Sequence, residues 1–402
     1  MTLTQVQLVQ MQRQVESFLV NKHNKDGSPY ILGVGFGLEE INNVLTSPPK
    51  IAFRVYFDSR EASQNKGGPI SAPPFLTPSD PPICTVNVAQ WTGESEPNTD
   101  FVPGPYRSEL VSGLDIHSGS GYMDRGLGSG TLGFFATLNS EQDKLKNVVL
   151  VTNYHVVIKA PSVAPEREFK EDDYVWRSTK SIAKIVNVTR PNGKKVPGWK
   201  DFHLYSYQDY SGDTPRPYYV DCAAAWLIRE KTSCCKAICP DTWTEFKNVV
   251  QHLETELPGR NITNVARLTH LDLLQSVQAA QAPEYKILTV FKSGRTTGLT
   301  WGRVIDVMAP YPKKGLIIIE STKKDGSNNL MNFADHGDSG SALLNSQREL
   351  VGLVYAIEGS NQTRAYACHI HPVLNCLERH GRDQRQPHPR QRGSGGDVVR
   401  GR

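Results

Sequence analysis

From about residue 111 to residue 377, short apolar runs alternate with turn residues along the chain. The sequence contains 33 glycines and 26 prolines, which punctuate these runs and favour turns. Apolar runs this short between turn signals are typical of strands. The sequence therefore predicts a mainly β chain, with strands at residues 128–136, 148–152, 218–228, 288–291, 302–308, 315–319, 341–344 and 350–356.

One segment within this region has a different spacing. Between residues 241 and 281, apolar side chains recur at helical spacing and predict a stripe packed on the core. The members of this stripe are Trp243, Phe246, Val249, Val250 and Leu253.

The first sixty residues combine helix and strand patterns. Residues 3–20 place apolar side chains on one helical face, and residues 51–57 alternate as a half-buried strand does. Residues 31–38 contain a Gly-x-Gly-x-Gly run, which also occurs in nucleotide-binding loops. Because its glycines fall at strand period, we interpret it as a strand approached closely by other backbone. Residues 1–60 are therefore predicted to form a small α+β accessory module.

Composition divides the remainder into three parts. Residues 61–110 are rich in Pro and Gly and predict a linker or an extended strap. Residues 111–377 form the main domain, and residues 378–402 form a basic tail that we expect to be disordered. The tail carries seven arginines against three acidic residues, 7 − 3 = 4, which equals the net charge of +4. The body is thus formally neutral, which argues against nucleic acid as a partner.

The apolar runs and the cysteines of the sequence indicate the cellular compartment in which the protein is expected. Residues 1–20 lack a continuous apolar segment and no run is long enough to span a membrane, so we expect a cytoplasmic or nuclear protein without a membrane partner. Seven cysteines is an odd number, which favours free thiols. Cys234, Cys235 and Cys239 could form half of a zinc site, but no second Cys/His pair lies at finger-like spacing. We expect no metal and no cofactor.

A Gly-Asp-Ser-Gly sequence at residues 337–340 runs directly into an apolar strand. A serine hydroxyl is a weak nucleophile unless a base and an oxyanion site lie beside it. Gly337 would let the backbone turn so that its N–H and that of Ser339 point at one developing oxyanion. The alternative is an ordinary loop, since Gly, Asp and Ser are also common turn residues.

A histidine and an aspartate with suitable surroundings precede this segment. His155 follows the buried run at residues 148–152, and Asp221 stands inside the apolar run at residues 218–228. Burying an unpaired carboxylate is costly, so Asp221 requires a partner. A histidine N–H would satisfy Asp221, and the carboxylate would orient the ring and stabilise its protonated form.

These segments together resemble the trypsin- and chymotrypsin-like serine protease family, in particular its intracellular and bacterial members. The similarity lies in Thr-Asn-Tyr-His at 152–155, Val-Asp-Cys-Ala at 220–223, Ser-Gly-Arg-Thr-Thr-Gly at 293–298 and Gly-Asp-Ser-Gly at 337–340, and it covers roughly residues 125–375. It implies two six-stranded antiparallel β-barrels. It also implies Ser339 as nucleophile, His155 as general base, Asp221 as the orienting carboxylate, and the N–H groups of Gly337 and Ser339 as the oxyanion hole.

The resemblance also implies a substrate pocket, and the chain departs from the family's pattern at several positions. Phe333 stands at the family's specificity position, which suggests an apolar or restricted pocket, and Tyr355, Ala356 and Ile357 fall where the family lines its cleft. Ser341 replaces a glycine found in many members, and no cysteines stand where secreted members form disulfides.

The sequence therefore predicts a serine endopeptidase acting on proteins or peptides. The alternative is a protease-like scaffold that binds a partner protein through residues 1–110, with the segment 67–105 across its cleft. An α/β-hydrolase esterase would place its serine first, before the acid and the histidine, which is not the order here.

Overall fold

The computed structural model describes most of the elements that surround the predicted site. The described residues are 3–23, 31–42, 44–58, 70–88, 110–119, 128–137, 148–157, 174–177, 180–185, 187–189, 195–197, 204–207, 216–227, 246–250, 261–279, 288–358 and 361–383. Among them no helix is long and apolar enough to cross a membrane.

The helices and strands follow one another along the chain as two groups of sheets. The first group and the preceding segment comprise α1 (Gln5–His23), β1 (Ile31–Leu38), β2 (Glu40–Ile41), β3 (Val44–Leu45), β4 (Ile51–Phe57), β5 (Ile83–Asn87), β6 (Leu110–Ser112), β7 (Asp115–Gly119), β8 (Gly128–Thr131), β9 (Phe134–Thr137), β10 (Val148–Thr152), α3 (Tyr154–Val157), β11 (Tyr174–Arg177), β12 (Lys180–Ile185), β13 (Asn187–Thr189), β14 (Lys195–Pro197), β15 (Leu204–Tyr207), β16 (Arg216–Tyr219) and β17 (Ala223–Leu227). The second group comprises β18 (Phe246–Val250), β19 (Asn264–Val265), α4 (His270–Ala279), β20 (Thr289–Gly294), β21 (Gly298–Ala309), β22 (Leu316–Ser321), β23 (Ala342–Asn345), β24 (Glu349–Glu358), β25 (Asn361–His369) and α5 (Ile370–Asp383).

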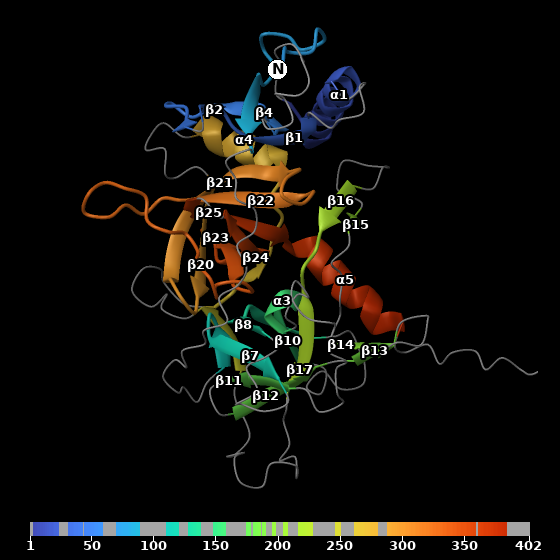
Figure 1. Ribbon diagram of the computed structural model, residues 1–402, viewed down its shortest axis with the longest axis vertical. Helices are drawn as coiled ribbons and strands as arrows, with labels where there is room; N and C mark the ends of the chain where they lie inside the picture. Colours follow the sequence, from blue (N-terminus) through green and yellow to red (C-terminus); the bar gives the residue numbers. More distant parts are fainter. Residues whose placement is uncertain are drawn as a thin grey trace, which may run out of the picture.

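Six strands of the C-terminal half close into an antiparallel barrel. Their order is β20-β23-β24-β25-β22-β21, and β21 pairs back with β20 to complete the circle. Figure 1 shows these strands in orange and red in the middle of the molecule. The aliphatic side chains of their apolar runs, such as Ile317, Ile319 and Leu353, are fully buried. Closure leaves these strands paired on both sides.

The N-terminal segment extends the barrel's sheet instead of forming a sheet of its own. Strand β1 pairs with the long barrel strand β21, with Gly37 opposite Asp306. Strand β4 then pairs with β1, and β5 pairs in parallel with β4. Helix α1 packs on β1, and its buried Leu8, Val15 and Leu19 belong to the same apolar cluster as the barrel (Figure 1).

The other half of the molecule is a seven-stranded antiparallel sheet. Its order is β8-β7-β11-β12-β17-β10-β9. It has its own apolar cluster, which includes Ile116, Leu132, Leu150 and Val156. Figure 1 places this sheet, in teal and green, below the barrel, and α3 lies on the side that faces it. The sheet also contributes to the barrel's apolar cluster, which includes Phe134 of β9, Val149 and Val151 of β10 and Ala224 of β17.

The prediction of a mainly β fold is confirmed by these sheets, and the C-terminal half is the closed six-stranded barrel that was expected. The helix and two strands expected within residues 1–60 are present as α1, β1 and β4. Nothing in the residue pattern indicates that β1 and β4 join the barrel's sheet. The boundaries at residues 60, 110 and 377 stay predictions, and the tail from residue 384 onward lies outside the described residues.

Two segments differ from their sequence interpretation. The Pro/Gly-rich region 61–110 contains a strand, β5, because Ile83, Cys84 and Val86 extend along β4 despite the prolines before them. The segment with helical spacing near residue 246 is the strand β18, parallel to β6. Aromatic and β-branched residues favour strands, and in a short apolar run periodicity alone does not separate the two structures.

Candidate active site

His155 and Asp221 lie at the adjoining ends of two paired strands. Strands β10 and β17 are antiparallel, with Thr152 opposite Ala223, so the residues after β10 meet those before β17. His155 Nδ1 is 2.5 Å from Asp221 Oδ2. The structure therefore brings together the two residues that the sequence singled out as base and orienting acid.

The carboxylate of Asp221 is buried and held from several sides. Its Oδ1 accepts a hydrogen bond from the Tyr154 N–H at 2.7 Å, and its backbone carbonyl accepts one from Asn153 Nδ2 at 2.7 Å. The Asp221 side chain is fully buried, whereas the His155 side chain is 11% exposed. Because Nδ1 faces Asp221, Nε2 is the nitrogen left for another partner.

Ser339 follows Asp338 at the start of the turn into β23, on the opposite side of the site. Its Oγ donates a hydrogen bond to the carbonyl oxygen of Tyr355 at 3.2 Å. The Tyr355 ring also meets the His155 ring edge to face, with 5.9 Å between the ring centres. Among the described residues, Ser339 Oγ is hydrogen-bonded to Tyr355 and not to His155. Tyr355 is thus the contact that the serine and the histidine share.

Thr131, from β8 in the other half of the molecule, braces the loop around Ser339. Its Oγ1 donates to the carbonyl of Gly337 at 2.8 Å, and its N–H donates to the carbonyl of Ser339 at 2.9 Å. Thr152 Oγ1 in turn donates to the carbonyl of Thr131 at 2.7 Å. Thr131 and Thr152 are fully buried. The serine loop is therefore fastened across the junction of the two halves.

Two N–H groups of this loop are also paired. Asp338 N–H donates to the carbonyl of Asp335, and Gly340 N–H donates to that of Val354, both at 2.9 Å. Gly340 has a φ of +90°, a conformation that favours glycine.

The N–H groups of Gly337 and Ser339 have no acceptor in the described part of the chain. Backbone N–H groups in folded proteins are nearly always paired, with protein, water or ligand. Gly337 has a φ of +96°, so its conformation also favours glycine. Two unpaired donors in one loop are what an oxyanion site requires.

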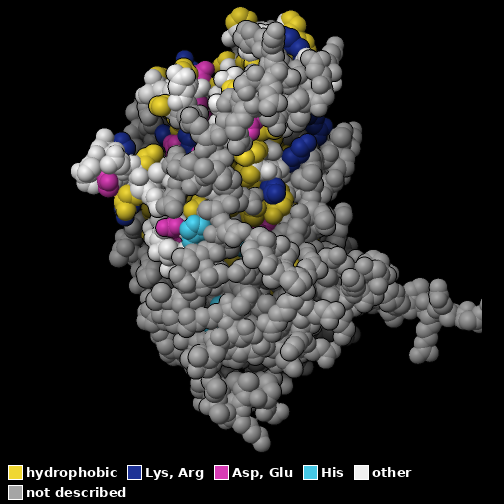
Figure 2. Space-filling model, in the orientation of Figure 1, with side chains coloured by type: hydrophobic (Ala, Val, Ile, Leu, Met, Phe, Trp, Pro, Cys, Tyr) yellow, Lys and Arg dark blue, Asp and Glu magenta, His cyan; other side chains and the backbone are white. Residues whose placement is uncertain are grey.

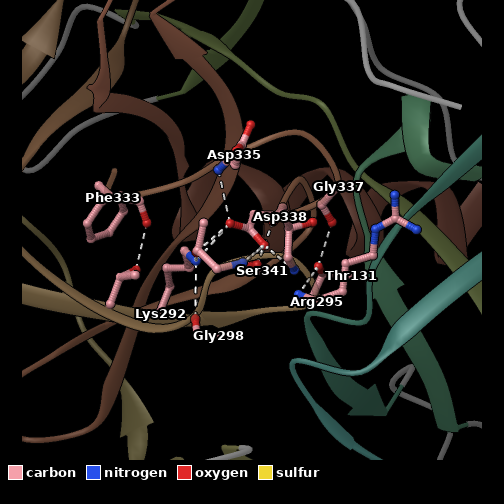
Figure 3. A network of polar contacts seen from close by, with 12 residues as sticks. Thr131, Lys292, Arg295, Gly298, Phe333, Asp335, Gly337, Asp338 and Ser341 are labelled. Atoms are coloured by element: carbon pink, nitrogen blue, oxygen red, sulfur yellow. Dashed lines mark hydrogen bonds and ion pairs between the residues drawn. The ribbon is translucent and has the colours of Figure 1, made fainter. Parts of the chain in front are cut away.

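A buried ion pair lies directly behind this loop. Lys292 Nζ, from β20, is 2.9 Å from Asp338 Oδ2, and neither side chain has any exposed surface. Lys292 Nζ also donates to Thr297 Oγ1 and to the carbonyl of Gly298. Figure 3 shows Lys292 and Asp338 at the centre of the polar network, between Phe333 and Thr131. Burial lowers the pKa of Lys292 below its usual value, although Asp338 opposes this shift.

Asp338 is the acceptor for most of the network. Its Oδ1 accepts from the N–H groups of Thr296 and Thr297 at 2.8 and 3.2 Å. Its Oδ2 accepts from Thr297 Oγ1 at 2.6 Å and from Asp335 N–H at 3.0 Å. A carboxylate with this many donors is fixed in position, and so is the backbone that carries it.

The predicted substrate-pocket residues have different exposures. Phe333 is fully buried, with its carbonyl bonded to Thr300 Oγ1 at 2.6 Å and its ring 6.0 Å from Lys292 Nζ. A substrate could touch this ring only after neighbouring side chains moved. Tyr355 and Ile357 are each 5% exposed, and Ala356 is half-buried. The pocket stays a prediction.

Sequence reasoning missed three contributors to this site: Thr131, Thr296 and Lys292. The Ser-Gly-Arg-Thr-Thr-Gly segment is part of the family resemblance, but the resemblance assigned no role in the site to its residues. Its threonines and the preceding Lys292 all contact Asp338, more than forty residues further on. A buried Asp338 beside the serine was the available signal, because a buried carboxylate demands a cation or several donors.

Among the described residues no three His, Cys, Asp or Glu side chains are grouped as they would be around a metal ion. Cys84, Cys222, Cys368 and Cys376 are buried and form no disulfide with one another. The cysteines at 234, 235 and 239 lie outside the described residues.

Comparison with known proteins gives matches among solved structures alone. No protein family model matches the chain, and no curated protein matches it. The chain is similar to protease A from Thermobifida fusca (16% identity, 67% of this chain and 96% of that one, TM-score 0.35). It is also similar to the protease from Nocardiopsis (15%, 66% and 95%, 0.33) and to the chymotrypsin from Cellulomonas bogoriensis (15%, 67% and 96%, 0.33). The fold assignment itself depends on the strand order of the closed barrel described above.

Proposed function

We propose that this chain is a serine endopeptidase that hydrolyses peptide bonds through His155, Asp221 and Ser339. The observation that carries the proposal is the pair of N–H groups on Gly337 and Ser339 that have no acceptor among the described residues, in a loop whose neighbouring N–H groups are bonded. Their position beside a serine, near a His–Asp pair, matches the requirements of acyl transfer.

The hydroxyl must change its partner before the chemistry begins. The Ser339 hydroxyl leaves the carbonyl of Tyr355 and donates to His155 Nε2. His155 takes the hydroxyl proton while Oγ attacks the substrate carbonyl carbon, and Asp221 stabilises the resulting imidazolium. The Gly337 and Ser339 N–H groups stabilise the oxyanion, and such a donor is worth about 3–4 kcal/mol of the barrier.

Collapse of the tetrahedral intermediate breaks the peptide C–N bond. His155 gives its proton to the leaving amine, which departs and leaves an acyl ester on Ser339. Water then attacks the ester carbon while His155 accepts a proton from it. The C–Oγ bond breaks, His155 returns the proton to Ser339 Oγ, and the carboxylic acid product leaves. The substrate class is a protein or peptide.

The second candidate is a protease-like scaffold that acts by binding a partner. The hydrogen bond from Ser339 Oγ to Tyr355 and the complete burial of Phe333 favour it. In that case the hydroxyl would stay on the Tyr355 carbonyl, and the serine would be inert.

A fluorophosphonate probe separates the two candidates. We expect the full-length protein to be labelled covalently, and Ser339→Ala to abolish labelling. Ser346→Ala provides the matched control, because Ser346 is an exposed serine bonded only to Gln347 among the described residues. Labelling of the wild type that survives in Ser339→Ala, or no labelling of the wild type, would contradict the endopeptidase proposal.

A further inference from the structure

Two hydroxyl groups hold the carbonyls next to the unpaired N–H groups. Thr296 Oγ1 donates to the carbonyl of His336 at 2.6 Å. Ser341 donates to the carbonyl of Asp338 twice, from Oγ at 2.5 Å and from its N–H at 3.0 Å.

These carbonyls belong to the same peptide groups as the unpaired donors. The His336 carbonyl and the Gly337 N–H form one peptide unit, and the Asp338 carbonyl and the Ser339 N–H form another. In a trans peptide the C=O and N–H point in opposite directions. A hydroxyl that holds the carbonyl on one side therefore turns the N–H to the other side.

We infer that Thr296 and Ser341 are positioning residues that orient the two oxyanion-hole N–H groups. The inference builds on the proposed function, because an oxyanion hole matters only if Ser339 forms an acyl-enzyme. The hydroxyls act through the backbone and do not touch the substrate.

The Gly337 peptide is the one that most needs holding. Gly337 has no Cβ, so its φ, one of the two dihedral angles that flank the 336–337 peptide, changes with little steric cost. If this peptide turned over, the His336 carbonyl would face the oxyanion and repel it. Thr296 is exposed, but its hydroxyl still reaches the His336 carbonyl. This hydrogen bond opposes rotation of the 336–337 peptide.

Thr296 is itself fixed independently of its hydroxyl. Its N–H donates to Asp338 Oδ1 at 2.8 Å, and Asp338 is paired with Lys292. Replacing the hydroxyl by a methyl group in Thr296→Val keeps this N–H bond. The variant therefore removes the hold on His336 and little else.

The test compares Thr296→Val with a matched control elsewhere. Thr263 is also exposed, and its Oγ1 donates to a backbone carbonyl, that of Gln347, at 3.0 Å. We expect Thr296→Val to slow labelling of Ser339 by a fluorophosphonate roughly tenfold, and Thr263→Val to leave the rate unchanged. Thr296→Ser, which restores a hydroxyl, should restore the rate.

Hydrolysis of p-nitrophenyl acetate gives a second readout. Loss of oxyanion orientation lowers kcat and leaves KM nearly unchanged, because the oxyanion forms only during the reaction. Ser341→Ala is expected to have a smaller effect than Thr296→Val, since the Ser341 N–H still holds the Asp338 carbonyl.

The outcomes separate this inference from the proposed function. If the wild type is labelled and Thr296→Val is labelled equally fast, the positioning role is overturned and the endopeptidase proposal stands. If the wild type is not labelled, the endopeptidase proposal fails, and a crystal structure of Thr296→Val decides the positioning role. A turned 336–337 peptide in that crystal supports the role, and an unchanged peptide overturns it.

Discussion

Lys292 and Asp338 place two opposite charges next to the serine loop with no access to solvent. A buried ion pair contributes little when compared with an apolar pair, but removing one partner leaves the other charge uncompensated. Asp338 in turn receives the N–H groups of Thr296, Thr297 and Asp335. The pair therefore connects the stability of the fold to the shape of the loop.

Lys292→Met is expected to lower the free energy of unfolding by about 3–5 kcal/mol, because Asp338 would remain buried without its cation. Denaturant unfolding measures this loss. Lys314→Met is the control, since the Lys314 side chain is exposed, and it should change stability by less than about 0.5 kcal/mol. Equal midpoints for the two variants would show that Asp338 does not depend on Lys292.

At the residue scale, the site residues that could be predicted were those whose immediate sequence neighbours indicated a role. Asp221 stands among apolar residues, so its need for a partner was visible, and His155 is 2.5 Å away. Lys292 carries no such signal, because a lysine inside a strand pattern is ordinarily exposed. Its partner lies 46 residues later, and only the folded barrel brings the two together.

At the element scale, the junction between β25 and α5 holds a buried histidine. His369 is 8% exposed, and its Nε2 lies 2.8 Å from the carbonyl of Val307 on β21. Its ring also packs on that of Tyr218, 5.2 Å away between centres. Burial lowers the pKa of His369 to about 4, although the hydrogen bond to Val307 opposes the shift.

This shift predicts a loss of stability in acid. Because the pKa of His369 in the folded chain is below its unfolded value of 6.5, the unfolded chain binds more protons between pH 6.5 and 4. The contribution of His369 is complete above pH 6.5 and is lost as the pH falls through 4. His369→Gln keeps an N–H donor that does not titrate.

The wild type should therefore lose up to about 3 kcal/mol more than His369→Gln over this pH range. Denaturant unfolding at a series of pH values measures the difference. His371 is half-buried and its pKa is also lowered to about 4, chiefly by burial, but it is present in both proteins. Parallel pH profiles for the two proteins would contradict the assignment.

Element types were predictable where the residue pattern had a single physical explanation. The glycines of β1 fall at strand period, and their close approach to other atoms is confirmed. A Cβ on Gly35 would lie 2.1 Å from Asp306 Oδ2, and one on Gly37 would lie 2.0 Å from the carbonyl of Ile305. The glycine pattern predicted that another segment approaches β1 closely. Only the folded structure identifies that segment as β21.

At the scale of the whole molecule, a buried ionic network joins the N-terminal segment to the barrel. Arg54 on β4 forms an ion pair with Glu40, and its Nε lies 3.3 Å from Oδ2 of Asp306 on β21. Tyr56 also donates to Asp306 at 2.7 Å. Burial raises the pKa of Asp306, although Arg54 opposes the shift. The charges on both sides of this junction compensate one another.

A second branch of the network reaches the neighbouring barrel strands β22 and β25. Arg364 on β25 pairs with Glu40 and, at 3.0 Å, with Glu320 on β22. Arg303 pairs with the same Glu320 at 2.8 Å. Burial by itself would raise the pKa of Glu40, but Arg54 and Arg364 together hold it below its usual value. Glu40, from the N-terminal segment, is thus a shared anion for two buried arginines.

On the face drawn in Figure 2, the described residues show no comparable concentration of charge. Basic, acidic and hydrophobic side chains of the described residues are interspersed there over the upper part of the molecule. The exposed large apolar residues among those described are Val6, Ile41, Val44, Phe75 and Met331. Binding of a partner protein by residues 1–110 stays a prediction.

Removing residues 1–60 tests whether this segment is an appended module or part of the barrel. The truncation would uncover the β21 edge and the apolar side chains under α1, and it would leave Asp306 buried without Arg54. We therefore expect the shortened chain to unfold at a much lower denaturant concentration or to aggregate, whereas the full chain unfolds with the barrel and α1 in one transition. Glu39→Gln in the full-length chain is the control, because Glu39 neighbours Glu40 but has no ion pair among the described residues, and it should be nearly neutral. A shortened chain with the stability of the full-length protein would mean that residues 1–60 are an independent accessory module, as their helix and strand patterns predict.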